Sequence, residues 1–147
     1  MSANSIKTLM TVSATNTGGR NGHSETDDHS VSVNLGTPKE LGGPGTAGTT
    51  TPEHLFAAGY AACFGGAFDL VGKMHKKDAS GTVTKCDVGF GPREGGGYGI
   101  SVKMHLTAPH LTQAEAEAIA KETHEKICPY SHATRGNIDF DLVVVGN

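Results

Sequence analysis

Two of the chain's three cysteines, Cys63 and Cys128, occur in settings that suit thiol redox chemistry. Cys63 stands in the apolar stretch AACFGG, and Cys128 stands before a proline in KICPYSHATRG. A thiolate attacks peroxides and disulfides, so two cysteines can pass through a sulfenic acid and a disulfide and return to thiols. The third, Cys86, alternates with apolar residues and is interpreted as a small core residue. For the other two, core packing and a working redox pair are the alternatives.

Ionisation decides between these alternatives for Cys63. Its expected place is about three turns into a helix, beyond the reach of the positive helix end, and on the apolar stripe, where burial raises a thiol pKa. Such a thiol reacts only if a cation is brought to it. Among the three arginines, Arg20 is flanked by Gly18, Gly19 and Gly22, which permit a close approach of the backbone. The residues alone leave both interpretations of Cys63 open.

Cys128 has a different expected setting, in the last turn of a second helix. The negative helix end disfavours a thiolate there, so Cys128 suits a second step in which it attacks a sulfur that is already oxidised. A zinc site is the rival use of this region, because His124, Cys128, His132 and Cys63 would supply four ligands. Their spacing matches no compact zinc pattern. We therefore expect neither a metal nor a cofactor.

The elements that must position the cysteines alternate between strands and helices. The predicted segments are an N-terminal region of strands (7–14 and 30–35) and linker over 1–50, a helix with Cys63 over 51–77, a strand pair over 82–107, a helix with Cys128 over 112–128 and a last strand over 138–145. A polar loop between the first two strands carries Arg20. This order predicts one α+β domain over residues 1–147, with antiparallel sheets packed around two main helices.

Both helices have clear starting signals. Thr51-Pro52-Glu53 supplies an N-cap, a favoured proline and an acid, and Thr112 to Glu115 forms a capping box. The middle of the first helix contains three glycines, at positions 59, 65 and 66, although each internal glycine costs about 1 kcal/mol. A closely packed neighbour is the expected reason, such as the same helix of a second chain.

Composition narrows the range of partners and locations. The chain has 147 residues and a formal net charge of −3, without a basic cluster, so we expect no nucleic-acid partner. No run approaches about 20 consecutive apolar residues, and the N-terminus lacks the pattern of a signal peptide. We expect a cytoplasmic protein without a membrane partner. An odd number of cysteines also argues against a disulfide framework.

Three motifs, ATNTGGRNG, TTPEHLFAAGYAACF and KICPYSHATRGNID, together resemble the organic hydroperoxide resistance (Ohr) branch of the Ohr/OsmC family. The resemblance covers nearly the whole chain in the expected order. The CPYS form around Cys128 and the early arginine are more similar to this branch than to its OsmC relatives. The resemblance implies an OsmC-like fold, an intertwined homodimer and a thiol-dependent peroxidase that needs neither metal nor haem.

Residue roles follow from the same resemblance. It implies that Cys63 is the peroxidatic cysteine and Cys128 the resolving one, that Arg20 is the activating cation, and that Glu53 holds Arg20. The substrate would be an organic hydroperoxide, and a dithiol such as a lipoylated protein would reduce the Cys63–Cys128 disulfide. An apolar pocket for the substrate would be lined by Phe56, Tyr60, Phe64, Phe68 and Met74, which suit a plain core equally well.

Three alternatives to this function and one question of geometry remain. The same thiols would serve an OsmC-type peroxidase or a redox sensor without turnover, and a carrier of apolar ligands would leave them passive. Glu53 and Cys63 are ten residues apart, about 15 Å along a continuous helix. If Arg20 contacts both residues, it has to span that gap or meet a Glu53 from elsewhere, and we hypothesise that each site takes Glu53 from the other subunit.

Overall fold

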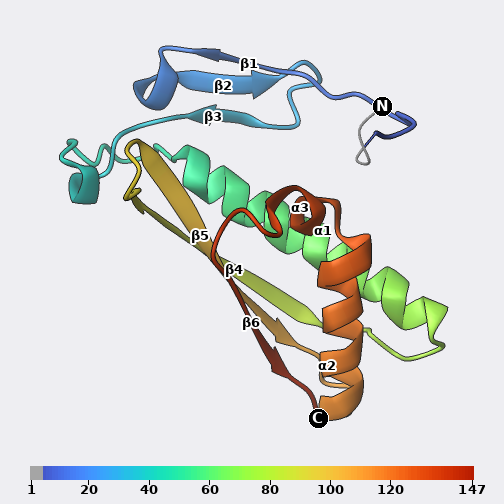
Figure 1. The fold of residues 1–147 in the computed structure, drawn as a ribbon. Helices are drawn as coiled ribbons and strands as arrows, with labels where there is room; N and C mark the ends of the chain where they lie inside the picture. The colour runs from blue at the N-terminus through green and yellow to red at the C-terminus, as the bar shows by residue number, and fades with distance from the viewer. Residues whose placement is uncertain (1–4) are drawn as a thin grey trace. The chain divides into compact units, whose positions relative to one another are not determined.

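The α+β class predicted from the order of elements is confirmed by a computed structural model, which describes residues 5–147 (Figure 1). The chain divides into two compact units, Met1–Pro52 and Glu53–Asn147. Arg20 belongs to the first unit. Both redox-candidate cysteines belong to the second.

The first unit contains a three-stranded antiparallel sheet in the order β1-β2-β3. Its strands are β1 (Ala14–Thr17), β2 (His23–Thr26) and β3 (Ser32–Asn34). The strand predicted over 30–35 is confirmed, but the one over 7–14 is wrong, since β1 begins where that range ends. β2 lies in the stretch predicted as a loop. Polar cross-strand bonds replace the apolar alternation that guided the prediction: the Ser32 hydroxyl donates to Glu25 Oε1 at 2.8 Å.

Arg20 sits in the middle of a 3₁₀ turn, Gly19–Asn21, between β1 and β2. The first residue of the turn has a φ of +62°, which favours glycine. Gly22 is required for space, because a Cβ there would lie 1.7 Å from the carbonyl oxygen of Thr17. The Asn16 side chain closes the turn, accepting from its first amide at 2.8 Å and donating to the carbonyl of the same residue at 3.2 Å. The glycines around Arg20 thus build a defined turn.

The second unit contains a sheet in the order β4-β5-β6. β4 (Val83–Pro92) and β5 (Tyr98–Thr107) form the predicted antiparallel pair. β6 (Phe140–Val145) pairs with β5 in parallel, so the expectation of purely antiparallel sheets is wrong here. The chain leaves β5 and returns to β6 through helices, and a parallel pair needs such a crossover.

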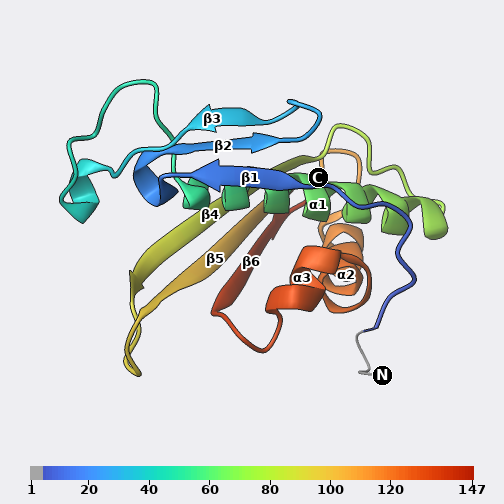
Figure 2. The same ribbon diagram turned by 90° about the horizontal axis from the view of Figure 1, so that it is seen from above.

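Three α-helices belong mainly to the second unit. They are α1 (Pro52–Met74), α2 (Gln113–Glu122) and α3 (Pro129–Thr134). The single helix predicted over 112–128 is wrong beyond residue 122, because a π-helical segment, Thr123–Ile127, follows α2. Figures 1 and 2 show these helices on one face of the β4-β5-β6 sheet. The buried core is drawn from α1, β5 and α2: Tyr60, Phe64, Phe68, Val71, Val102, Met104, Leu106, Ala116 and Ile119.

The composition of α1 follows from its neighbours. By length and composition alone it would also suit a membrane span. Its large side chains Tyr60, Phe64 and Phe68, however, have no exposed surface and lie in this core. The predicted close packing is seen within the chain at two of its three glycines: a Cβ at Gly59 would lie 3.3 Å from the ring of Tyr130, and one at Gly65 would lie 3.0 Å from Thr84 Oγ1, whereas one at Gly66 would meet nothing within 4 Å.

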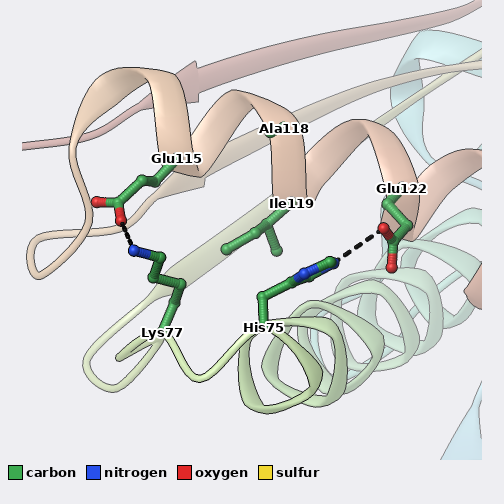
Figure 3. Close-up of a pocket in the computed structure, with 6 residues that line it drawn as sticks. All are labelled: His75, Lys77, Glu115, Ala118, Ile119 and Glu122. Atoms are coloured by element: carbon green, nitrogen blue, oxygen red, sulfur yellow. Dashed lines mark hydrogen bonds and ion pairs between the residues drawn. The ribbon is translucent and has the colours of Figure 1, made fainter.

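A cavity of about 250 Å³ lies between the end of α1 and α2 (Figure 3). An ion pair and a histidine–carboxylate contact flank it and join the segment after α1 to α2. Lys77 Nζ lies 2.6 Å from Glu115 Oε2, and His75 Nε2 lies 3.0 Å from Glu122 Oε1. Ile119 lies between the two pairs in Figure 3. These contacts hold α2, and hence the segment that leads to Cys128, against the end of α1.

The predicted capping box of α2 is present and should contribute to stability. The Glu115 amide donates to Thr112 Oγ1 at 3.2 Å, and the Thr112 amide donates to Glu115 Oε1 at 3.0 Å. Thr112→Ala is expected to lower the unfolding free energy by about 1 kcal/mol in urea denaturation at pH 7. An unchanged urea midpoint would contradict this role.

Glu115 makes part of this stability dependent on pH. Lys77, followed by the amide and hydroxyl of Thr112, lowers the pKa of Glu115 from 4.5 to about 2. The stabilisation by Glu115 is therefore complete above about pH 4.5 and is lost as the pH falls toward 2. Glu115→Gln should be less stable than the native protein at pH 7, with the difference shrinking in that window. Glu94→Gln, in the exposed hairpin between β4 and β5, is the matched control.

Candidate active site

The structure brings Cys63 and Cys128 together. The thiol of Cys128 donates to Cys63 Sγ across 3.6 Å, and both cysteines are free thiols. A disulfide has an S–S length of about 2.05 Å, so the sulfurs need to approach by about 1.5 Å to form one. Cys63 is half-buried, and Cys128 is 1% exposed. This spacing is that of a reduced dithiol whose two sulfurs need only a small movement to form a disulfide.

The setting of Cys128 differs from the prediction. Cys128 does not end a regular helix at its negative end: it follows the π-helical segment and is the N-cap residue of α3. Its sulfur accepts the amide N–H of Ser131 at 3.4 Å. The physical reason is Pro129, which ends the preceding helix and also occupies the favoured first position of the next. The side chain therefore lies at the positive end of a short helix.

The Cys63 thiol has the electrostatics that the sequence predicts for an apolar stripe. Burial raises its pKa from 9.0 to about 11, and a hydrogen bond from the backbone of Tyr130 acts in the opposite direction. Cys86, on β4, is also half-buried, packs against the core as expected, and has its pKa raised by burial to about 11. Cys63 thus differs from Cys86 in its contact with Cys128. In the second unit, the pKa of each of these two thiols is raised, not lowered.

A buried polar network that the sequence reasoning missed adjoins Cys128. Tyr60 Oη lies 2.7 Å from Ser131 Oγ and 3.2 Å from Thr134 Oγ1, and His124 Nδ1 lies 2.8 Å from Ser131 Oγ. The His124 ring stacks on Phe140 at 3.9 Å, and burial lowers its pKa, so it is neutral at pH 7. The available signal was Ser131 itself, a polar residue three positions after Cys128, at the third helical position of α3.

The five residues of the predicted apolar pocket differ in how deeply they are buried. They are Phe56, Tyr60, Phe64, Phe68 and Met74. Three of them, Tyr60, Phe64 and Phe68, are fully buried core side chains. Phe56 packs edge-on against Tyr60 with ring centroids 5.8 Å apart, at the margin of the core. Met74 is 57% exposed at the end of α1. Substrate binding by these residues stays a prediction.

Arg20 and Glu53 occupy defined positions, and their pairing stays a prediction. Arg20 lies in the 3₁₀ turn of the first unit, and Glu53 lies in the first turn of α1. Because α1 is continuous from Pro52 to Met74, the ten residues from Glu53 to Cys63 span about 15 Å along the helix axis, as expected.

The histidines of the rival zinc set have other partners. His124 Nδ1 is bonded to Ser131, and His132 Nδ1 lies 3.2 Å from Arg135 Nη2. Within residues 5–147, no three His, Cys, Asp or Glu side chains are grouped to hold a metal ion. The geometry around Cys128 favours thiol chemistry over a zinc site.

Comparisons with known proteins match from about two thirds of the chain to nearly all of it. The family model for OsmC-like protein matches residues 43–143. The organic hydroperoxide resistance protein of Xanthomonas axonopodis pv. citri is 45% identical over 139 residues, which are 94% of this chain and 96% of that protein.

Solved structures match at the level of the fold as well as the sequence. An organic hydroperoxide resistance protein from Elizabethkingia anophelis has a TM-score of 0.90 and 44% identity, covering 97% of this chain and 100% of that one. The organic hydroperoxide resistance protein OhrB of Bacillus subtilis has a TM-score of 0.85 and 38% identity, covering 93% of this chain and 99% of that one. The cysteine pair therefore lies in a fold shared with proteins named for hydroperoxide resistance.

Proposed function

This chain belongs to the OsmC-like family, in its organic hydroperoxide resistance branch, and we propose that it reduces organic hydroperoxides to alcohols with Cys63 and Cys128 as its redox pair. The observation that carries the proposal is the contact of 3.6 Å between the two sulfurs, which come from segments 65 residues apart. Of the two cysteines, Cys128 is buried and Cys63 is half-buried, so Cys63 is the sulfur that the substrate can reach.

The reaction has three balanced steps. The Cys63 thiolate attacks one peroxide oxygen, the O–O bond breaks, and the departing alkoxide takes a proton to become the alcohol, leaving a sulfenic acid on Cys63. The Cys128 sulfur then attacks that sulfenic sulfur, releasing water and forming the disulfide. An external dithiol, such as that of a lipoylated protein, exchanges with the disulfide, becomes oxidised and restores both thiols.

The first step requires a cation, because burial raises the pKa of Cys63 to about 11. We assign this role to Arg20, whose guanidinium would stabilise the thiolate and the negative charge on the departing alkoxide. Glu53 would orient the guanidinium. Both assignments rest on the family motifs around these residues and on the charge that Cys63 needs.

Turnover distinguishes this enzyme from a redox sensor built on the same thiols. With excess dihydrolipoamide, the protein should consume many equivalents of cumene hydroperoxide per chain, and glutathione should support it less well because a monothiol does not complete the exchange internally. A sensor would stop after one equivalent. Consumption that ends at one equivalent per Cys63, with reductant still present, would overturn the enzymatic proposal.

A homodimer is part of the proposal. Four apolar side chains near the N-terminus are highly exposed in the single chain: Ile6 (82%), Leu9 (92%), Met10 (81%) and Val12 (76%). A second copy of the chain would cover such exposed apolar side chains. The distance of about 15 Å between Glu53 and Cys63 along α1 supports sites shared between two chains.

Mixed dimers test the sharing of Glu53. A Cys63→Ser chain lacks the nucleophile but keeps Glu53, and a Glu53→Ala chain has the reverse. If each site takes Glu53 from the other subunit, a heterodimer purified through two tags should recover about half the native activity, because one of its two sites is complete. Activity no higher than that of the Glu53→Ala homodimer would count against sharing.

A further inference from the structure

α1 and the segment that begins at Cys128 are joined at two levels. One is the sulfur contact of 3.6 Å between Cys63 and Cys128, and the other is the hydroxyl contact of 2.7 Å between Tyr60 and Ser131. Tyr60 precedes Cys63 by three residues, and Ser131 follows Cys128 by three. Residues three apart lie on the same face of a helix, so the hydroxyl contact sits one turn away from the sulfurs on both sides.

The hydroxyl contact is sealed from water. Tyr60 and Ser131 each have no exposed surface, and Thr134 is 8% exposed. A buried polar group that loses its partner has no solvent to replace it, so losing one of these bonds would weaken the attachment of the segment to α1. Ser131 also donates its amide to Cys128 Sγ at 3.4 Å. Fixing Ser131 therefore fixes the resolving sulfur.

Counting hydrogens gives the network one direction. The Thr134 hydroxyl donates to the Tyr130 carbonyl at 2.9 Å, so it accepts from Tyr60. Because the hydroxyl hydrogen of Tyr60 is donated to Thr134, Tyr60 can only accept from Ser131, and the Ser131 hydroxyl is therefore the donor. Because the hydroxyl hydrogen of Ser131 is donated to Tyr60, Ser131 can only accept from His124, so the neutral His124 must donate from Nδ1. The saturated network runs from His124 through Ser131 and Tyr60 to Thr134, and it assigns the Nδ1–H tautomer to His124.

We propose that this network positions Cys128 for disulfide formation, a role that rests on the proposed two-cysteine function. Ser131, Tyr60 and His124 act through the placement of Cys128 and are positioning residues. The sulfenic acid on Cys63 has two fates: condensation with Cys128, or attack on a second hydroperoxide to give a sulfinic acid. The first fate depends on the position of Cys128 and the second does not, so the network sets the ratio between them.

The test removes the central hydroxyl with Ser131→Ala, which keeps the amide that donates to Cys128. After a pulse of cumene hydroperoxide, mass spectrometry of Cys63 should give a ratio of disulfide to sulfinic acid about tenfold below native, the effect of one hydrogen bond of about 1.4 kcal/mol. Tyr60→Phe, which keeps the ring, should lower the same ratio. Ser131→Thr, which restores a hydroxyl, should recover it, and Ser101→Ala, at an exposed position of β5, is the matched control.

A second measurement is independent of peroxidase activity. In a dithiothreitol redox buffer, Ser131→Ala should make the Cys63–Cys128 disulfide about tenfold easier to reduce, which corresponds to a shift of about 30 mV. Native ratios and a native potential in both Ser131→Ala and Tyr60→Phe would overturn the positioning role. Failure of the native protein to form any sulfenic acid or disulfide with hydroperoxide would instead overturn the proposed function.

Discussion

Replacing Cys63 with serine is expected to lower hydroperoxide turnover by a factor on the order of 10³ or more, because the nucleophile itself is removed. A serine hydroxyl does not ionise near neutral pH and forms no sulfenic acid. The loss should be equal with every hydroperoxide and every dithiol. Consumption of cumene hydroperoxide with excess dihydrolipoamide measures it.

The other two cysteines provide the contrast for this result. Cys128→Ser should still consume a first equivalent of hydroperoxide, since Cys63 remains, but no disulfide should form and Cys63 should proceed to sulfinic acid. Cys86→Ser, on β4 and packed against the core, is the control that removes a thiol outside the pair. If Cys63→Ser and Cys86→Ser reduced turnover equally, the assignment of Cys63 as nucleophile would be wrong.

Arg20→Gln is expected to lower turnover by a factor on the order of 10²–10³, the loss typical for one group that stabilises developing negative charge. Without a cation, the pKa of Cys63 is raised by burial to about 11. At pH 7 such a thiol is ionised in only about one molecule in 10⁴. In the native protein Arg20 should hold this pKa lower, and the variant should let it rise toward 11.

The pH dependence of Cys63 alkylation by iodoacetamide measures that shift directly, with Cys128→Ser as the background so that only one sulfur of the pair reacts. Arg93→Gln is the matched control, because Arg93 lies in the exposed hairpin between β4 and β5, where its guanidinium donates to the Gly96 carbonyl at 3.5 Å. An alkylation pKa that is equal in native and Arg20→Gln proteins would remove Arg20 from the mechanism.

The sequence predicts α1 well because local signals and the apolar pattern agree. Thr51-Pro52-Glu53 marks its start, and its buried side chains recur every three or four residues. α1 ends at residue 74, three residues before the predicted end at residue 77, because Lys76 adopts a positive φ of 57° that no periodic pattern reveals. The strands β4 and β5 are equally clear, because alternating apolar residues flank a glycine-rich turn.

The surroundings of Cys128 could not be predicted from the same signals. Pro129 ends one helix and starts another, and the π-helical bond from the Cys128 amide to the Thr123 carbonyl, 2.8 Å long, has no pattern in the residue types. The residues of β2 are polar, so the apolar alternation that indicates a strand is absent there. The parallel pairing of β6 depends on a crossover that sequence order alone does not reveal. These features arise from contacts between distant residues.

The unequal burial of the two sulfurs also dictates the regiochemistry of recycling. Cys128 is only 1% exposed, so in the proposed cycle an incoming thiolate should attack the Cys63 side of the disulfide. The mixed disulfide would then be attached at position 63, and the leaving group would be the sulfur of Cys128. The Ser131 amide already faces that sulfur and accommodates its emerging charge. Under the proposed cycle, access to one atom on α1, the Cys63 sulfur, would govern which reductants react.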